Sequence, residues 1–331
     1  MTSCGDLRIL FRAAAGPGRG YGHLVRCRSL ARALGVRPLV APRGGPLVID
    51  TALALGCDVV RGSASRVMSG LRPEVLIVDD PIAGDARRWM RAARRVGALV
   101  VSVHDLGLGC LDADLVIDGS ITRNARARRG LTLAGAKYAV LDPAVLDAVP
   151  PPFLLDVPTD RDPYAVLIAL GGGPRAELAN DIAEAVVEAH PHARVRIAGG
   201  FEGISRDDAA RISWIGPSRN LHVEMARASV AVVGGGVSLY EACAHGVAAV
   251  GVPVVAAQRP TVAAFVKRGV ARGVTSGRVT AESVAAECAE LLTDEAVRRH
   301  MARMGRRLID GRGAFRAAAA VCRLARAARD R

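Results

Sequence analysis

The sequence predicts an α/β protein made of two doubly wound, Rossmann-like domains, and three observations support this. The chain has 331 residues, more than one hydrophobic core usually serves, and half of them are hydrophobic. Runs rich in Val, Ile and Leu alternate with helix-like stretches, as in parallel sheets buried on both faces. This alternation is interrupted once, by a proline-rich segment near the middle of the chain.

Strands are expected where a short aliphatic run shows little polar alternation. The first series is 7–13, 38–42, 74–80, 99–105 and 114–119, and the second is 164–170, 193–199 and 229–235. Six prolines fall within 142–164, and proline lacks a backbone donor and disfavours helix before it. The predicted parts are therefore an N-terminal domain (1–145), a linker (146–163), a C-terminal domain (164–310) and an Arg-rich helix (311–331).

Composition argues against several classes of protein. The most apolar run, 247–257, is shorter than the ~20 residues that a membrane crossing needs. The N-terminus lacks the basic and apolar segments of a signal peptide. The seven cysteines are scattered without a CxxC pair, which favours reduced thiols in a cytoplasmic protein over a disulfide frame or a zinc site.

The net charge of +13 is concentrated at the end of the chain, where residues 297–331 hold eleven Arg against two Asp. One interpretation is solvated helix faces, and the other is weak attraction to phosphate-bearing partners or to an anionic membrane surface. Nucleic acid is not expected as a partner, because no recognition motif occurs and aromatic residues are scarce.

Ligands of open parallel sheets bind beyond the carboxyl ends of the strands, so the loops after strands should carry the chemistry. The first such loop contains Gly16, Gly18, Gly20 and Gly22. Its spacing fits neither the dinucleotide fingerprint nor the P-loop. Glycines there permit a ligand to approach the backbone closely.

His23 follows this loop at the start of a helix whose apolar stripe includes Leu24 and Cys27. A helix N-terminus lowers the proton affinity of an imidazole, so a neutral His23 could take a proton from water. The alternative is a histidine that only caps or packs the loop. Asp80 and Asp105, at the ends of two predicted strands, are candidates for holding ligand hydroxyls or orienting His23; they could equally cap helices.

Two further loops repeat the order of strand, three glycines and helix start, and such helix starts bind anions. The candidate phosphate-binding residues are Gly172, Gly173, Gly235, Gly236 and Val237. Ser238 and Glu241 have the spacing of a capping box. The functional alternative for Glu241 is a carboxylate that accepts both hydroxyls of a ribose.

The chain resembles a known family at this point. Gly20, Gly22, His23 and Arg26 match the G-x-GH-x-x-R core of the UDP-sugar hydrolase of pseudaminic acid biosynthesis and its spore-coat-polysaccharide relatives. Further matches are VDD (78–80), GAKYAVLDPAVL (135–146), LGGGP (170–174), GGGVSLYEACAHGV (234–247) and DGRGAFR (310–316). The third glycine loop, Glu241 and Gln258 also resemble the nucleotide-sugar half of MurG-like glycosyltransferases.

The resemblance implies a GT-B-type fold, two Rossmann-like domains facing across a cleft, with the last helix returning to the first domain. It implies inverting hydrolysis, without metal or cofactor, of a UDP-activated amino sugar of the 2,4-diacetamido-2,4,6-trideoxyhexose type. His23 matches the catalytic residue and Glu241 the ribose-binding carboxylate. Gly20, Gly22 and Arg26 fall in the matched core, and Gln258 would lie near the nucleotide or be a solvated loop residue.

The chain departs from the family at several positions, which keeps other functions open. The loop after the first strand reads AAA (13–15) instead of carrying an acid, and the acid-His-Tyr group is replaced by Asp79, Asp80 and Pro81. The alternatives are a GT-B glycosyltransferase with a UDP-sugar donor, a hydrolysing 2-epimerase, and a degenerate nucleotide-sugar-binding protein.

Overall fold

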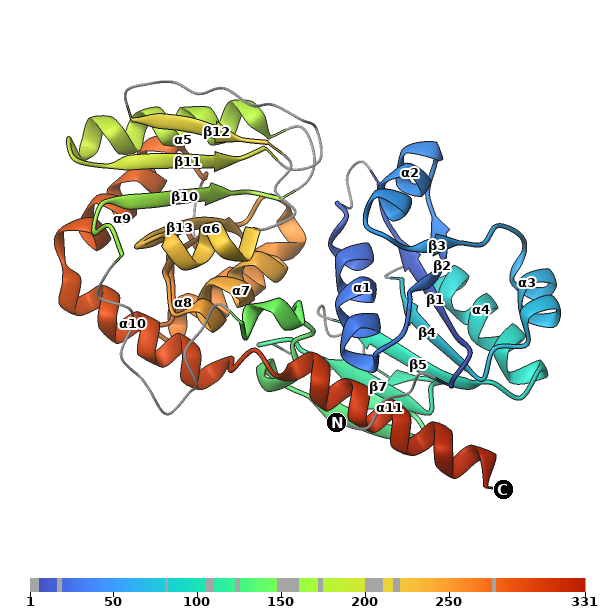
Figure 1. The fold of residues 1–331 in the computed structure, drawn as a ribbon. Helices are drawn as coiled ribbons and strands as arrows, with labels where there is room; N and C mark the ends of the chain where they lie inside the picture. The colour runs from blue at the N-terminus through green and yellow to red at the C-terminus, as the bar shows by residue number, and fades with distance from the viewer. Residues whose placement is uncertain are drawn as a thin grey trace. The chain divides into compact units, whose positions relative to one another are not determined.

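The computed structural model describes residues 6–16, 20–80, 83–104, 110–122, 126–147, 161–171, 175–199, 211–216, 221–275 and 278–330. The chain divides into two compact units (Figure 1). Unit 1 comprises Met1–Pro143 and Gly311–Arg331, and unit 2 comprises Ala144–Asp310. Most of the linker predicted over 146–163 lies outside the described residues.

Unit 1 is a parallel sheet of the order β3-β2-β1-β4-β5-β7-β9. Its strands are β1 (Ile9–Ala14), β2 (Leu39–Arg43), β3 (Asp58–Val59), β4 (Val75–Asp79), β5 (Leu99–His104), β7 (Leu115–Asp118) and β9 (Leu131–Ala134). The helices are α1 (Gly22–Leu34), α2 (Pro46–Ala54), α3 (Ala64–Leu71), α4 (Ala83–Arg95) and α11 (Gly313–Arg329). A separate short pair joins β6 (Cys110–Leu111) and β8 (Arg126–Ala127), and two 3-10 turns, η1 (Ala136–Tyr138) and η2 (Pro143–Val145), follow.

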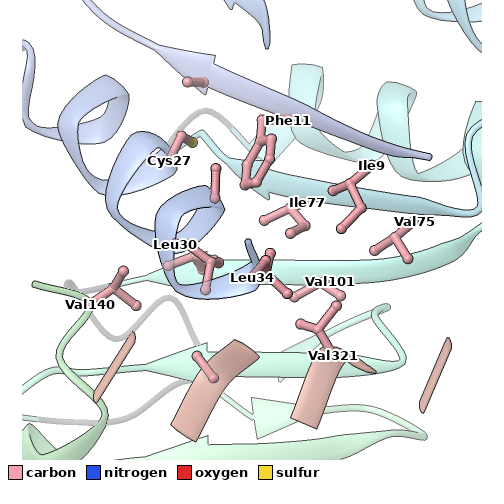
Figure 2. Close-up of a cluster of buried hydrophobic side chains, with 14 of the residues drawn as sticks. Ile9, Phe11, Cys27, Leu30, Leu34, Val75, Ile77, Val101, Val140 and Val321 are labelled. Carbon is pink, nitrogen blue, oxygen red and sulfur yellow. The ribbon is translucent and has the colours of Figure 1, made fainter. Parts of the chain in front are cut away.

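Strand alternation divides the core of unit 1 between the two faces of the sheet. Phe11 and Ile77 pack against Leu30 of α1 and Val321 of α11 (Figure 2). The intervening residues Leu10, Leu76 and Val78 belong instead to the cluster that includes residues of α3 and α4. Successive side chains of a strand point to opposite faces of the sheet, so two adjacent polar residues at a strand end lie on different faces.

The C-terminal helix α11 belongs to unit 1, where its Ala-rich face is buried against α1. Gly313 lets the start of α11 approach the residue after η1, because a Cβ there would lie 2.0 Å from the carbonyl oxygen of Ala139. Arg329 at the far end donates from Nε to Glu74 at 2.6 Å. None of the described helices combines the length and apolarity needed to cross a bilayer.

The cysteines differ from the expectation of reduced thiols at one position. Cys322 of α11 is disulfide-bonded. The thiols of Cys27, Cys57, Cys243 and Cys288 are free and buried. Composition and spacing alone did not indicate this bond.

Unit 2 is a second parallel sheet, in the order β12-β11-β10-β13-β14-β15. Its strands are β10 (Ala165–Ala169), β11 (Arg194–Ala198), β12 (Ile212–Ile215), β13 (Val230–Gly234), β14 (Ala248–Val252) and β15 (Arg272–Gly273). The helices are α5 (Ala176–Ala189), α6 (Leu221–Arg227), α7 (Val237–His245), α8 (Arg259–Lys267), α9 (Ala281–Thr293) and α10 (Glu295–Leu308), with the 3-10 turn η3 (Ala256–Gln258) before α8.

The eight predicted strands are confirmed as β1, β2, β4, β5, β7, β10, β11 and β13. Strand β14 was not predicted, because this apolar strand follows α7 with only Gly246 and Val247 between them. The four-residue strands β9 and β12 and the two-residue strands were not predicted either, because short strands give little periodic signal.

Unit 2 contains a histidine buried at the end of α7. His245 is 1% exposed, and neither of its ring nitrogens has a hydrogen-bond partner in the described part of the chain. Burial, together with the positive charges of Arg161, His222 and Arg306, lowers its pKa from 6.5 to about 3. The Arg161 guanidinium donates to the carbonyl oxygens of His245 and Gly246 at 2.9 and 2.8 Å, closing the helix end.

We expect His245 to make the protein less stable as the pH falls. The unfolded chain takes up a proton near pH 6.5, whereas the folded ring stays neutral down to about pH 3. The free energy of unfolding should therefore decrease by about 1.4 kcal/mol per pH unit between about pH 6 and pH 4. Urea unfolding of wild type and His245→Leu over this range should show that the variant lacks this component; equal pH dependence of both proteins would contradict the prediction.

Candidate active site

The loop after β1 leads directly to His23. Gly16 and Gly20 have φ of 129° and 76° and exchange two backbone hydrogen bonds of 3.2 and 3.0 Å, while residues 17–19 between them are not described. Helix α1 then begins at Gly22, and no side chain caps it. His23 therefore lies in the first turn of α1 and does not act as its N-cap.

His23 contacts an acid–base pair at the end of β4. Its Nδ1 lies 2.8 Å from Oδ1 of Asp79 and 3.0 Å from Nη2 of Arg26. Arg26 donates from Nε and Nη2 to the two oxygens of Asp79, each at 2.6 Å. The side chains of His23, Asp79 and Arg26 are 14%, 2% and 5% exposed, so only His23 is appreciably open to solvent.

This arrangement keeps Asp79 ionised. Burial by itself raises the pKa of the Asp79 carboxyl, but the adjacent Arg26 guanidinium and His23 ring outweigh burial and hold that pKa well below its ordinary value of 3.8. An ionised carboxylate that accepts from the Nδ1 side of a histidine can orient the ring and stabilise its protonated form.

Two expectations change here. Asp79, not Asp80, contacts His23, because Asp79 follows Ile77 on the face that packs against α1. Asp80 follows Val78 on the other face and accepts from Nε and Nη2 of Arg43 at 2.7 and 2.6 Å. Arg26, expected among the substrate-binding residues, is buried and directed at Asp79.

A second ionic group lies under the α4 side of the sheet. Arg12 donates from Nη2 to Asp85 at 2.5 Å and lies 4.8 Å from the centre of the Trp89 ring. Its Nη1 donates to the carbonyl oxygen of Ala41 at 3.0 Å. Two arginines, Arg12 and Arg43, thus balance Asp80 and Asp85, which makes this group a supporting network for the strand ends.

The sequence analysis also missed His104 at the end of β5. Its Nε2 lies 2.5 Å from the hydroxyl of Ser102, and both residues are buried. Asp118, the register partner of His104 on β7, accepts from the backbone N–H and the hydroxyl of Ser120. The alternation of Ser102 and His104 near the end of the predicted strand 99–105 could have indicated this pair from the sequence. The predicted site residue Asp105 lies outside the described residues.

In unit 2 the two glycine loops follow neighbouring strands. β10 pairs with both β11 and β13, so the sheet reverses its winding between β10 and β13. Such a switch point is where open α/β sheets bind ligands. Gly171 has φ of 90°, whereas Gly172 and Gly173 lie outside the described residues.

The loop after β13 fits closely between its neighbours. A Cβ on Gly235 would lie 2.7 Å from Cγ2 of Val262 and 3.0 Å from Cβ of Gln258. Helix α7 begins at Val237 with Gly236 as its N-cap and without a side-chain cap. In the described part of the chain the N–H groups of Gly236, Val237 and Ser238 have no hydrogen-bond partner, as at an anion-binding helix start.

The structure distinguishes between the alternatives at three further residues. Ser238 is the second residue of α7, so it is not an N-cap and forms no capping box with Glu241; both side chains are half-buried. Gln258 is also half-buried, and its Oε1 accepts from the N–H of Val254 at 3.0 Å. It is therefore not a solvated loop residue but supports the loop facing Gly235.

Arg175 approaches the same loop from the start of α5. Its Nη1 donates to the carbonyl oxygen of Val254 at 2.7 Å, and burial lowers the pKa of its guanidinium. The described residues include no group of three or more His, Cys, Asp or Glu side chains able to hold a metal ion. The candidate groups are thus a His–Asp–Arg cluster in unit 1 and helix-start N–H groups with nearby Arg175 in unit 2.

Two parallel α/β units of this strand order define a GT-B-type fold, and solved structures agree. MurG of Acinetobacter baumannii superposes with a TM-score of 0.66 at 16% identity, covering 96% of this chain and 99% of MurG. A complex of S. aureus MnaA with UDP gives 0.59 at 14% identity, covering 93% and 94%. At such identities the likeness is one of fold.

Sequence comparison adds two similarities. The family model for UDP-glucoronosyl and UDP-glucosyl transferases matches residues 176–309. The spore coat polysaccharide biosynthesis protein SpsG of Bacillus subtilis (strain 168) is 24% identical over 335 residues, which cover 93% of this chain and 95% of SpsG.

Proposed function

We propose that the protein hydrolyses a UDP-activated amino sugar, with inversion at the anomeric carbon and release of UDP. The observation that carries the proposal is the 2.8 Å contact between His23 Nδ1 and the ionised Asp79. This contact leaves Nε2 of His23 to act on a water molecule. Similarity to SpsG and to the UDP-glycosyl transferase model supports a UDP-sugar as the substrate.

In the proposed reaction, His23 takes a proton from water as the water oxygen attacks C1 of the sugar. The bond between C1 and the oxygen of the β-phosphate breaks, and its electron pair leaves with UDP. Asp79 stabilises the imidazolium that forms, and base assistance of this kind contributes roughly 10²–10⁴-fold. Attack from the face opposite to UDP inverts the anomeric configuration.

Departure of UDP needs stabilisation of negative charge, which unit 2 can supply. The N–H groups of Gly236, Val237 and Ser238 lie at the positive, N-terminal end of the α7 dipole, and such a helix start suits the negative charge of a diphosphate. Arg175, held by the Val254 carbonyl, is a candidate for the adjacent phosphate oxygens. Glu241, one turn into α7, is proposed to hold the ribose hydroxyls.

A glycosyltransferase is the second candidate, favoured by the match of residues 176–309 to a family model of UDP-sugar transferases. The same His–Asp pair would then deprotonate an acceptor hydroxyl, and the sugar would pass to that oxygen rather than to water. Activity without acceptor distinguishes the two functions.

The test is to incubate the full chain with a panel of UDP-sugars, including 2,4-diacetamido-2,4,6-trideoxyhexoses, and to follow UDP and the anomeric protons by NMR. Hydrolysis predicts stoichiometric UDP and free sugar in buffer alone, with the opposite anomer appearing first. UDP release only after addition of an acceptor would favour transfer. No turnover of any sugar, with UDP still bound, would favour a binding protein.

A further inference from the structure

Arg26 has a position that the proposed chemistry does not by itself require. It lies one helical turn after His23 on α1 and is 5% exposed, so it is withdrawn from solvent. Its Nε and Nη2 both donate to Asp79, and Nη2 also lies 3.0 Å from Nδ1 of His23. A buried arginine in contact with both members of a His–Asp pair can influence where the proton of the imidazole lies.

We infer that Arg26 is a positioning residue that neutralises Asp79 and thereby keeps His23 uncharged, with its proton on Nδ1 and its Nε2 lone pair available. This inference rests on the proposed function, because it explains how His23 can be a base. It assigns Arg26 a role in the protonation of His23 instead of a contact with substrate.

The position of the proton follows from the donors and acceptors. A carboxylate can only accept hydrogen bonds and a guanidinium can only donate them. Asp79 is ionised, so the hydrogen between Nδ1 and Oδ1 belongs to Nδ1. Arg26 Nη2 donates to Oδ1 at 2.6 Å, whereas Nη2 and Nδ1 are 3.0 Å apart, so the shorter contact of Nη2 is the one to the carboxylate.

The charge balance follows from the same contacts. A lone buried carboxylate 2.8 Å from an imidazole strongly favours the protonated ring, which cannot act as a base. With Arg26 in place, the cluster of Arg⁺, Asp⁻ and neutral His carries no net charge. Cys27, a titratable group beside the cluster, stays a neutral thiol because burial raises its pKa well above 9.0. Asp80, Arg43 and Arg12 pair on the opposite face of the sheet.

The experiment is a ¹⁵N-histidine NMR titration of the full chain, with the signal of His23 assigned from its loss in His23→Asn. We expect the wild-type ring to show the Nδ1–H form. In Arg26→Gln the titration midpoint of the ring should move to higher pH by about one unit or more, and in Arg26→Lys by less. The matched control is Arg32→Gln, because Arg32 lies on the same helix but pairs with Asp142.

Activity gives a second readout. The acid limb of the kcat profile of Arg26→Gln should move to higher pH, with KM little changed and activity partly recovered under alkaline conditions. A purely structural role predicts a loss at every pH. An Nε2–H form in the wild type, or an unmoved midpoint in Arg26→Gln, overturns the inference.

If Arg26→Gln does not fold, the wild-type tautomer and the midpoint of Arg26→Lys decide the matter. If the protein turns over no UDP-sugar, the proposed function fails while the NMR titration still tests Arg26.

Discussion

Replacing His23 with Asn should lower the rate of UDP release about 10²–10⁴-fold. Asn can still hydrogen-bond to Asp79, but its amide cannot take a proton from water. The affinity for UDP should stay unchanged, because the groups proposed to bind the diphosphate lie at the start of α7 in unit 2. Steady-state kinetics with the best UDP-sugar of the panel, together with calorimetric UDP binding, measure both quantities.

Two neighbouring substitutions make this test specific. Asp79→Asn should cause a comparable loss, since an amide that donates to Nδ1 would place the imidazole proton on Nε2. Asp142→Asn alters the pairing of α1 through Arg28 and Arg32, away from His23, and should leave kcat nearly unchanged. Full activity in His23→Asn would exclude His23 as the base and with it the proposed mechanism.

The sequence was sufficient to predict the two parallel sheets, because their strands are continuous aliphatic runs. It could not decide between the two adjacent acids at the end of strand 74–80. Both follow the same buried run, and only their register against α1 separates Asp79 beside His23 from Asp80 beside Arg43. The alternation of Ile77 and Val78 between two core clusters supplies that register, but it requires knowing which face α1 covers.

Spacing within one helix gave partial information. His23 and Arg26 are three residues apart and were expected in the site together. Their shared partner Asp79, which turns Arg26 inward, lies 53 residues after Arg26 and is a tertiary contact. The spacing of Ser238 and Glu241, in contrast, suggested a local contact that the structure does not contain. The pattern fits a capping box with Ser238 as the N-cap, but the N-cap is Gly236 and α7 begins at Val237.

The two glycines at the start of α7 allow the proposed phosphate site to be tested separately from folding. Among the residues that the structure describes, a Cβ on Gly236 would meet only the Nε2 of Gln258, at 3.5 Å, an ordinary contact. Gly236→Ala should therefore change the free energy of unfolding by no more than about 0.5 kcal/mol. The added methyl group would nevertheless occupy the approach to the helix-start N–H groups, so the Kd for UDP should rise at least about tenfold, or about 1.4 kcal/mol.

Gly235→Ala should differ in a defined way. Its Cβ would lie 2.7 Å from the buried Val262, so the loop or α8 must shift, at an expected cost of about 1–3 kcal/mol. This variant should lose both stability and UDP affinity, whereas Gly236→Ala should lose affinity alone. Urea unfolding and calorimetry on the same preparations measure both. Wild-type UDP affinity in Gly236→Ala would mean that the diphosphate does not approach this helix start, and the nucleotide would then have to bind elsewhere.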